Sequence, residues 1–267
     1  MATFILSNDE NIVKCVRRRD IPADYYGPVI SVSDSNKKLK PTAGGYNDYG
    51  EKVPSTCWLI FNLTAVNTCP FRTRHCGGYL KGETRYEIDP KTGKKIDKKA
   101  YCYAVKSENA YPTVIPARRD NLKATILPIF VDMITAIIAR KLKYMKKERL
   151  IIRIHESGDF YNQVYAEKWV TVARRFENDP RVVFWAYTKS LPFFDWHNLP
   201  VNFRLRASLW DDTDPEYVKI MMDNDLPLYT VYDNELPAGY IECHCKDCGM
   251  CNQCGDPSKK RIACKRH

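Results

Sequence analysis

The sequence feature that most restricts the fold is an alternation of strand-like and helical segments between residues 150 and 232. The strand-like runs are short and rich in β-branched and aromatic residues. Strands that alternate with helices are typical of βαβ units, which assemble a parallel sheet. The predicted strands are Leu150–Ile154, Val182–Tyr187, Phe203–Ser208 and Leu228–Tyr232, and the predicted helices are Tyr161–Phe176 and Pro215–Asp223.

The first half of the chain adds a strand, a hairpin and a helix. Cys57–Leu63 has the length and aromatic content of a buried strand. The turn residues of Asp89–Gly93 predict a hairpin in the long loop that follows. From Asp120 to Leu142, apolar residues recur at spacings of three and four, which predicts a helix that Pro128 either kinks or starts.

These elements predict an α/β fold, either a partial (βα) barrel or an open parallel sheet, with a cysteine-rich C-terminal metal-binding module. A complete eight-fold barrel needs about 250 residues, and too few of the 267 remain once the two ends are set aside. We expect an irregular N-terminal segment over residues 1–55, an α/β metal-binding core over 56–240 and a cysteine-rich C-terminal module over 241–267.

The chain contains eleven cysteines, which indicate either a disulfide framework or metal sites. The count is odd, and the N-terminal residues MATFILSNDE lack the basic and long apolar regions of a secretion signal. The longest apolar region, Ile126–Ile138, is too short to span a membrane and contains Pro128 and Asp132. We therefore expect a reduced cytoplasmic protein with no membrane partner, whose cysteines bind metal.

The C-terminal tail contains a C-x2-C-x2-C-x2-C run, whose spacing lets successive thiolates surround one metal centre. Zinc sites usually take cysteines as separated pairs, so four in a row favour a [4Fe–4S] cluster, with zinc as the alternative metal. Which four cysteines share a cluster stays open, because the last cysteine of such a run often binds a different one. The run consists of Cys245, Cys248, Cys251 and Cys254, flanked by Cys243 and Cys264.

A second cysteine group, Cys69, Cys76 and Cys102, lies in the loop directly after the first predicted strand. Several basic residues accompany the first two, and positive charge stabilises thiolate ligands. The alternative is three unrelated thiols, since free cysteine packs as a small hydrophobe. We predict that the three meet at one metal centre, and that Cys15 and Cys57 are ordinary buried thiols.

Polar side chains follow two predicted strands at the points where these strands end. His155 and Glu156 are candidates for an acid and a base, and Asp159 for a polar anchor. Lys189 follows the next strand, and parallel strands present their carboxyl ends at one edge of a sheet. We predict that these four catalytic candidates border one pocket facing a cluster.

The same segment supplies two cofactor-binding candidates, Ser157 and Gly158. Glycine permits close backbone approach, and N–H groups at the start of the following helix can hold an anion. The alternative is a helix cap at Ser157 or Asp159 and a histidine satisfied in the core. Arg204 and Arg206, two apart on one strand, share a face, and we expect a solvated pair.

The order of motifs resembles a known family. TCPFRTRHC, CYA, IHESGDF, WAYTKS and a cysteine-rich tail ending in histidine follow one another over roughly residues 55 to 267. In this order they resemble a phage- and plasmid-encoded family named after a mycobacteriophage gene product. The resemblance implies an iron–sulfur protein without a settled activity, located in the host cytoplasm.

A looser resemblance, in topology, is to radical S-adenosylmethionine enzymes. There, three cysteines after the first strand of a partial barrel hold a cluster with one open iron site. The resemblance implies this role for Cys69, Cys76 and Cys102, with S-adenosylmethionine as a candidate ligand. Those enzymes use C-x3-C-x2-C, whereas here six residues separate the first two cysteines and twenty-five more lie before the third.

The net charge of +10 favours anionic partners. The leading hypothesis is a redox or radical-type enzyme with one or two [4Fe–4S] clusters, whose partner is a small anionic ligand or an electron donor. The rival is a non-catalytic nucleic-acid-binding protein in which clusters or zinc only stabilise the fold. The basic residues of the tail that support the rival are Lys259, Lys260, Arg261, Lys265 and Arg266.

Overall fold

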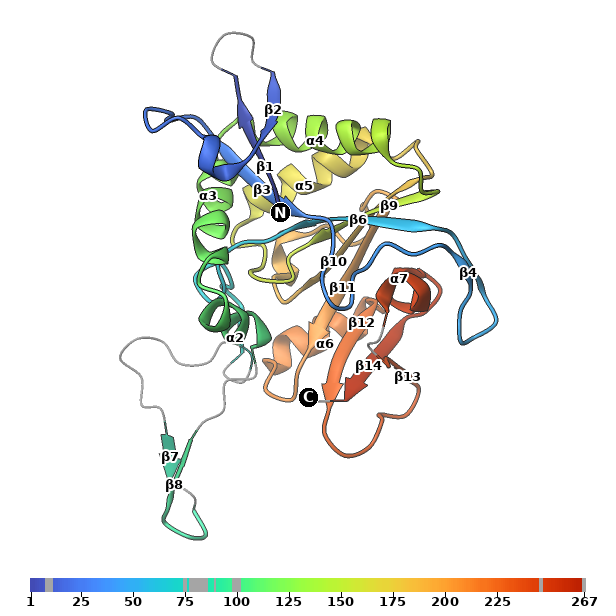
Figure 1. Ribbon diagram of the computed structural model, residues 1–267. Helices are drawn as coiled ribbons and strands as arrows, with labels where there is room; N and C mark the ends of the chain where they lie inside the picture. Colours follow the sequence, from blue (N-terminus) through green and yellow to red (C-terminus); the bar gives the residue numbers. More distant parts are fainter. Residues whose placement is uncertain are drawn as a thin grey trace.

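The computed structural model describes residues 1–7, 12–73, 76, 86–88, 90–97, 102–244 and 247–265. These residues are organised around one ten-stranded sheet (Figure 1). In spatial order its strands are β13 (Ile241–Glu242), β14 (Arg261–Lys265), β12 (Leu228–Tyr232), β11 (Phe203–Leu209), β10 (Val182–Thr188), β9 (Arg149–Ile154), β6 (Thr56–Phe61), β3 (Val29–Ser33), β1 (Ala2–Leu6) and β2 (Val13–Val16).

The strands from β13 to β6 run parallel, and β3, β1 and β2 extend the sheet in antiparallel fashion. From β6 the chain steps to β9, β10, β11 and β12 in turn, each beside the last. The outer strands, β13 and β2, do not pair with each other among the described residues, so the sheet is open. Of the two predicted alternatives, the open sheet is observed, although three of its strands are antiparallel; the barrel is not observed in the described part.

Helices and short hairpins connect the strands. The helices are α2 (Tyr103–Ala110), α3 (Val114–Ile126), α4 (Phe130–Tyr144), α5 (Gln163–Arg175), α6 (Pro215–Asp223) and α7 (Cys248–Cys251), with 3-10 turns η1 (Arg18–Asp20), η2 (Leu191–Phe193) and η3 (Gln253–Gly255). The hairpins are β4 (Gly45–Tyr46) with β5 (Lys52–Val53), and β7 (Tyr86–Ile88) with β8 (Lys95–Asp97).

One face of the sheet packs against α4 and α5 and forms the main core. Alternate residues of each strand point to one face, so Phe61 of β6 lies on the same side as Ile152 of β9. The Phe61 ring lies 5.3 Å from Trp169 of α5 and 5.7 Å from Phe130 of α4, centroid to centroid. Burial of these aromatic side chains is the main local source of stability.

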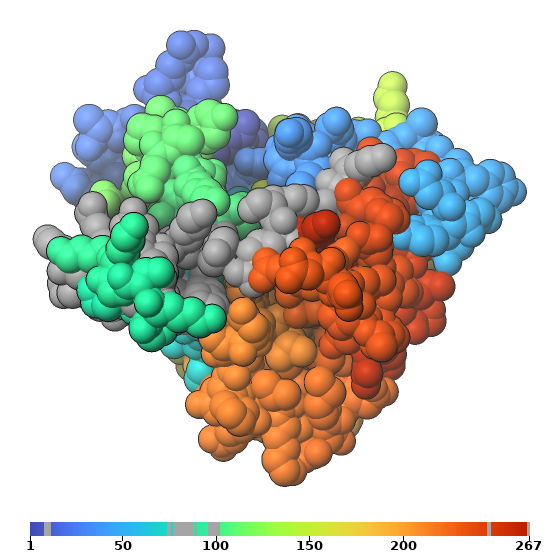
Figure 2. Space-filling view, turned by 90° about the horizontal axis from the view of Figure 1, so that it is seen from below, coloured from blue at the N-terminus to red at the C-terminus, as the bar shows by residue number. Residues whose placement is uncertain are grey.

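The opposite face is covered by irregular chain from the two ends of the sequence. Trp58 of β6 and Trp185 of β10 pack there with Cys254 of the tail, and the Trp58 indole donates to the Lys40 carbonyl at 2.9 Å. Figure 2 shows the C-terminal residues beside residues of about 40 to 55 on one surface. The amide of Gln253 donates to Glu51 across this contact at 2.7 Å.

The expectation of an irregular segment over residues 1–55 was wrong, because β1, β2 and β3 belong to the main sheet. Their apolar runs are only four or five residues long, so pairing with neighbouring strands stabilises them more than local sequence does. The tail over residues 241–267 likewise contributes β13 and β14, and β14 pairs with β12.

The predicted elements of the central region are confirmed. Every predicted strand from residue 57 to 232 has an observed counterpart, and the α6 and β12 bounds agree to the residue. The helix predicted from Asp120 is two helices, with Pro128 in the break between α3 and α4. Among the described residues no helix is long and apolar enough to cross a membrane.

Candidate functional site

The carboxyl ends of β9, β10, β11, β12 and β14, together with the loop after β6, surround a cavity of about 570 Å³. We call it the strand-end cavity. The predicted residues that line it are Cys69, Cys76, Cys102, His155, Glu156, Gly158, Asp159 and Lys189.

Three cysteines that are distant in sequence reach this cavity. Cys69 lies in the turn after β6, where its backbone N–H donates to the Val66 carbonyl at 3.1 Å. Cys102 is the residue before α2, and the N–H groups of Ala104 and Val105 in its first turn donate to the thiol. The thiols of Cys76 and Cys102 are hydrogen-bonded to each other, and Cys69 interacts electrostatically with both.

Hydrogen bonding and burial divide the protons unequally among these thiols. The hydrogen bond from Cys76 lowers the pKa of Cys102 to about 6, and the same bond raises the pKa of Cys76. Burial raises the pKa of Cys69 to about 12. Cys102 is therefore the thiol that loses its proton most readily, and a metal centre that binds all three must displace the protons held by Cys69 and Cys76.

The tail cysteines lie along the face of the sheet that the chain ends cover. Cys248 and Cys251 begin and end α7, and Cys254 lies in η3 and is 7 % exposed. The Tyr187 hydroxyl, at the wall of the strand-end cavity, is hydrogen-bonded to Cys254. Cys245 lies outside the described residues.

Neither a disulfide nor a single-ion site is formed by the described cysteines. None of the ten is in a disulfide. In the described ranges, no three His, Cys, Asp or Glu side chains are grouped so as to hold one metal ion. A [4Fe–4S] cluster differs in that each cysteine binds a separate iron.

His155 follows β9 with a left-handed backbone (φ 60°) and is 3 % exposed. Its Nε2 shares a 2.7 Å hydrogen bond with the Tyr165 hydroxyl, and its Nδ1 is buried without a hydrogen-bond partner. Burial, and to a smaller extent Arg153, hold its pKa well below the usual value, so the ring is neutral. Strained backbone at a buried polar residue is frequent at functional sites.

Glu156, Ser157 and Gly158 form the turn into the next segment. Backbone N–H groups of Glu156 and Ser157 donate to the Asn62 side chain at 2.7 and 3.2 Å, and the Glu156 carboxylate accepts from Asn36. Gly158 lines the cavity with φ +87°. The Ser157 hydroxyl is buried and lies outside the cavity lining, so the structure does not bring it to the other candidates.

The Asp159 carboxylate connects two loops. It accepts from the Thr188 hydroxyl at 2.7 Å, the Lys189 backbone N–H at 2.9 Å and the Phe160 backbone N–H at 2.8 Å. Burial raises its pKa, against these hydrogen bonds, which lower it. With three donors around it, Asp159 holds the β9 and β10 loops together, and it does not cap the following helix, whose N-cap is Asn162.

Lys189 is 8 % exposed and lines the cavity. Its Nζ donates to the Ser208 carbonyl at 3.1 Å and lies 5.2 Å from the centre of the Trp210 ring. Burial lowers its pKa, and the nearby Cys76 and Asp159 oppose that effect.

Sequence reasoning missed Arg153 and Tyr187 as cavity residues and misjudged Arg206. Arg153 is 7 % exposed in β9, and its guanidinium lies 4.4 Å from the centre of the Tyr187 ring. Their strands are paired neighbours, and both side chains point to the face opposite the helices, which strand alternation could have indicated. Arg206 is 2 % exposed rather than solvated, because its guanidinium donates to tail carbonyls, including that of Cys254 at 2.8 Å.

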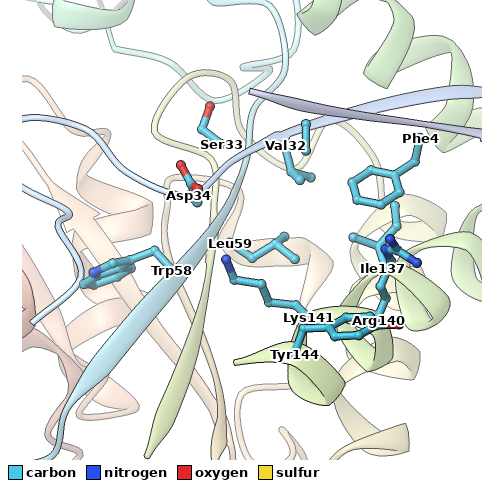
Figure 3. Close-up of a pocket in the computed structure, with 11 residues that line it drawn as sticks. Phe4, Val32, Ser33, Asp34, Trp58, Leu59, Ile137, Arg140, Lys141 and Tyr144 are labelled. Carbon is cyan, nitrogen blue, oxygen red and sulfur yellow. The ribbon is translucent and has the colours of Figure 1, made fainter. Parts of the chain in front are cut away.

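A second pocket, of about 160 Å³, lies between α4 and the strands β1, β3 and β6. Beside it, β3 pairs with the last two residues of β6. Figure 3 shows Lys141 extending from α4 toward Trp58 and Leu59. None of the candidate residues lines it.

Comparison of the sequence with models of known protein families gives a match. A family model described as gene product 88 matches residues 30–254, more than four fifths of the chain. The chain belongs to this family. The matched region includes the strand-end cysteines, the β9 and β10 loops and the tail run up to Cys254. Neither the curated proteins nor the solved structures contain a match. The expected phage gene-product family is therefore confirmed, and the resemblance to radical S-adenosylmethionine enzymes has no support from the comparisons.

Proposed function

We propose that this member of the gene product 88 family is an iron–sulfur enzyme that holds a [4Fe–4S] cluster with Cys69, Cys76 and Cys102. The observation that supports the proposal is the convergence of these three thiols on one cavity at the carboxyl ends of parallel strands. In open parallel sheets this is the usual location of a ligand.

The donor set fits a cluster with three cysteine ligands. The thiols of Cys76 and Cys102 are in contact, Cys69 interacts with both, and all three face the same cavity. When bound, such a cluster supplies one-electron transfer and, at an iron without a cysteine ligand, a position for a small molecule. In the radical-type version of the proposal that molecule is S-adenosylmethionine, and in the redox version the partner is an electron donor.

The other cavity residues have separate roles in this proposal. Lys189 places a buried positive charge near Cys76 and Cys69 and so offsets thiolate charge. Asp159 positions Lys189 through its backbone N–H. His155 is neutral and fixed by Tyr165, so Nδ1 is the ring atom left for a ligand or a proton. Glu156 contributes a carboxylate at the edge of the cavity.

The cysteines of the tail form the second metal-binding element of the proposal. Cys248, Cys251 and Cys254 lie within seven residues of one another, and Cys254 packs against the sheet. A metal there, whether a second cluster or zinc, would hold η3 against the sheet face and couple metal binding to folding.

The test is anaerobic purification followed by measurement of iron, acid-labile sulfide and zinc per chain. We expect a brown protein with iron and sulfide, and lower iron and sulfide content per chain in Cys69→Ser, Cys76→Ser and Cys102→Ser. Cys15→Ser is the matched control, because Cys15 is exposed on β2; the prediction that it is a buried thiol was wrong, whereas Cys57 is buried as predicted. Stoichiometric zinc without sulfide would contradict the proposal.

The rival function, nucleic-acid binding, is favoured by the net charge of +10. The basic tail supports it less than expected, because Lys259 pairs with Glu51 at 3.1 Å and Lys260 with Asp225 at 3.4 Å. Arg266 lies outside the described residues. A gel shift that weakens steeply with salt and is unchanged by loss of metal would favour the rival over the enzyme.

A further inference from the structure

Arg153 is a buried cation for which the described part of the chain provides no acidic partner. Its Nη1 donates to the carbonyls of Ile154 at 3.1 Å and Trp185 at 3.4 Å, and within the described ranges no ion pair joins it to a carboxylate. Arginine stays protonated in proteins, and a buried charge is costly unless an opposite charge lies near it. Because Arg153 lines the strand-end cavity, a ligand there is the natural source of that charge.

The thiols do not account for this charge. Lys189 is the buried cation that interacts with Cys76 and Cys69. Arg153 instead lies near His155, Tyr103 and Tyr187, and its positive charge acts to lower the pKa of each of these groups. Lys189 therefore lies near the thiols and the Trp210 ring, whereas Arg153 lies against the Tyr187 ring; we call the part of the cavity around Arg153 and Tyr187 its aromatic side.

The lining as a whole has the composition of a site for an anion that carries a planar ring. Its cations outnumber its carboxylates, which are Glu156 and Asp159, and its volume lies within the range of roughly 300–1,000 Å³ typical of small-molecule sites. Aromatic faces stack on bases, and guanidinium groups bind phosphate in a bidentate manner. The lining cations are Lys38, Arg72, Lys106, Arg153, Lys189 and Lys265, and the rings are Tyr103, Tyr187, Trp210 and Tyr229.

We propose that the aromatic side of the strand-end cavity binds a nucleoside phosphate, with Arg153 on its phosphate. This ligand is the substrate that the proposed enzyme presents to its cluster, so its catalytic meaning rests on the proposed function. Its binding does not, because Arg153 and the rings are present whether or not a cluster is bound.

The test is isothermal titration of the anaerobically purified full-length protein with AMP, GMP, CMP and UMP, and with inorganic phosphate. We expect at least one nucleotide to bind more tightly than phosphate. Arg153→Leu should weaken that nucleotide on the order of tenfold or more, as loss of a charge-assisted hydrogen bond does. Arg119→Leu is the matched control, because Arg119 is exposed on α3 and lies outside the cavity.

Arg153→Lys tests whether the loss of affinity in Arg153→Leu comes from a folding defect. Because it keeps the positive charge, Arg153→Lys should retain part of the nucleotide affinity. Binding of no nucleotide at millimolar concentration, or equal affinity for phosphate alone, would overturn the proposal. The proposal would also be overturned if mononucleotides do not bind but a single-stranded oligonucleotide binds tightly and Arg153→Leu abolishes that binding. Iron and sulfide measured on the same samples separate the two proposals: nucleotide binding without iron supports this one and contradicts the cluster.

Discussion

Replacement of Gly158 by alanine tests whether the loops after β6 and β9 are packed as tightly as the site requires. A Cβ at this position would lie 2.6 Å from Thr68 Oγ1 and 2.8 Å from Leu63 Cβ, and φ is +87°. A left-handed backbone costs alanine about 1–2 kcal/mol. Overpacking adds about 1–3 kcal/mol. We therefore expect Gly158→Ala to lower the free energy of unfolding by about 2–5 kcal/mol.

Gly239 provides the control, because it has a similar φ of +79° and a Cβ added there would meet no atom within 4 Å. Gly239→Ala should lose only the backbone contribution, about 1–2 kcal/mol. The assay is urea unfolding followed by tryptophan fluorescence, with iron content measured in parallel. If the two variants agree within about 0.5 kcal/mol, the steric argument is wrong and the contact between Gly158 and the β6 loop is loose.

Three further predictions concern charge and metal. Because the pKa of His155 is depressed in the folded state, the unfolded chain binds its proton first, so stability falls as pH drops below about 6.5. His155→Gln should reduce this loss by up to about 1.4 kcal/mol per pH unit, and a pH slope equal to that of the unsubstituted protein would refute the assignment. Arg206→Leu leaves tail carbonyls unsatisfied and should cost about 3 kcal/mol or more, with faster proteolysis of the tail; an unchanged cleavage rate would contradict this. Serine at Cys248 and Cys251 together should lower metal content and soluble yield, and full metal content in that variant would count against a tail metal site.

The central fold was predictable because its signals are local. The apolar runs that became β9, β10 and β12 are bounded by turns, and Pro128 marked a helix boundary through its own backbone chemistry. The N-terminal strands were not predictable in this way. β1 has only two buried residues, and its pairing with β2 and β3 stabilises it as a strand. This pairing depends on the rest of the sheet and cannot be recognised from the five residues of β1 alone.

The site was predictable to the extent that topology dictates it. Residues placed after parallel strands were expected at one edge, and His155 and Lys189 do line one cavity. The sequence could not indicate what each side chain would contact. Asp159 has its oxygens occupied by three donors, and the Ser157 hydroxyl lies outside the cavity; both depend on how neighbouring loops pack.

The tail links the sheet to the strand-end cavity. β14 pairs with β12, and its residue Cys264 lines the cavity. The segment between these strands carries α7 and η3, and Arg206 of β11 binds the carbonyl of Cys254 in η3. A change that frees η3 therefore removes hydrogen bonds from a buried arginine and disturbs the strand that forms one wall of the cavity. If the tail holds a metal as proposed, its removal should weaken ligand binding at Arg153, because Arg153 lies against the Tyr187 ring and Tyr187 is hydrogen-bonded to Cys254; two independent modules would not produce this effect.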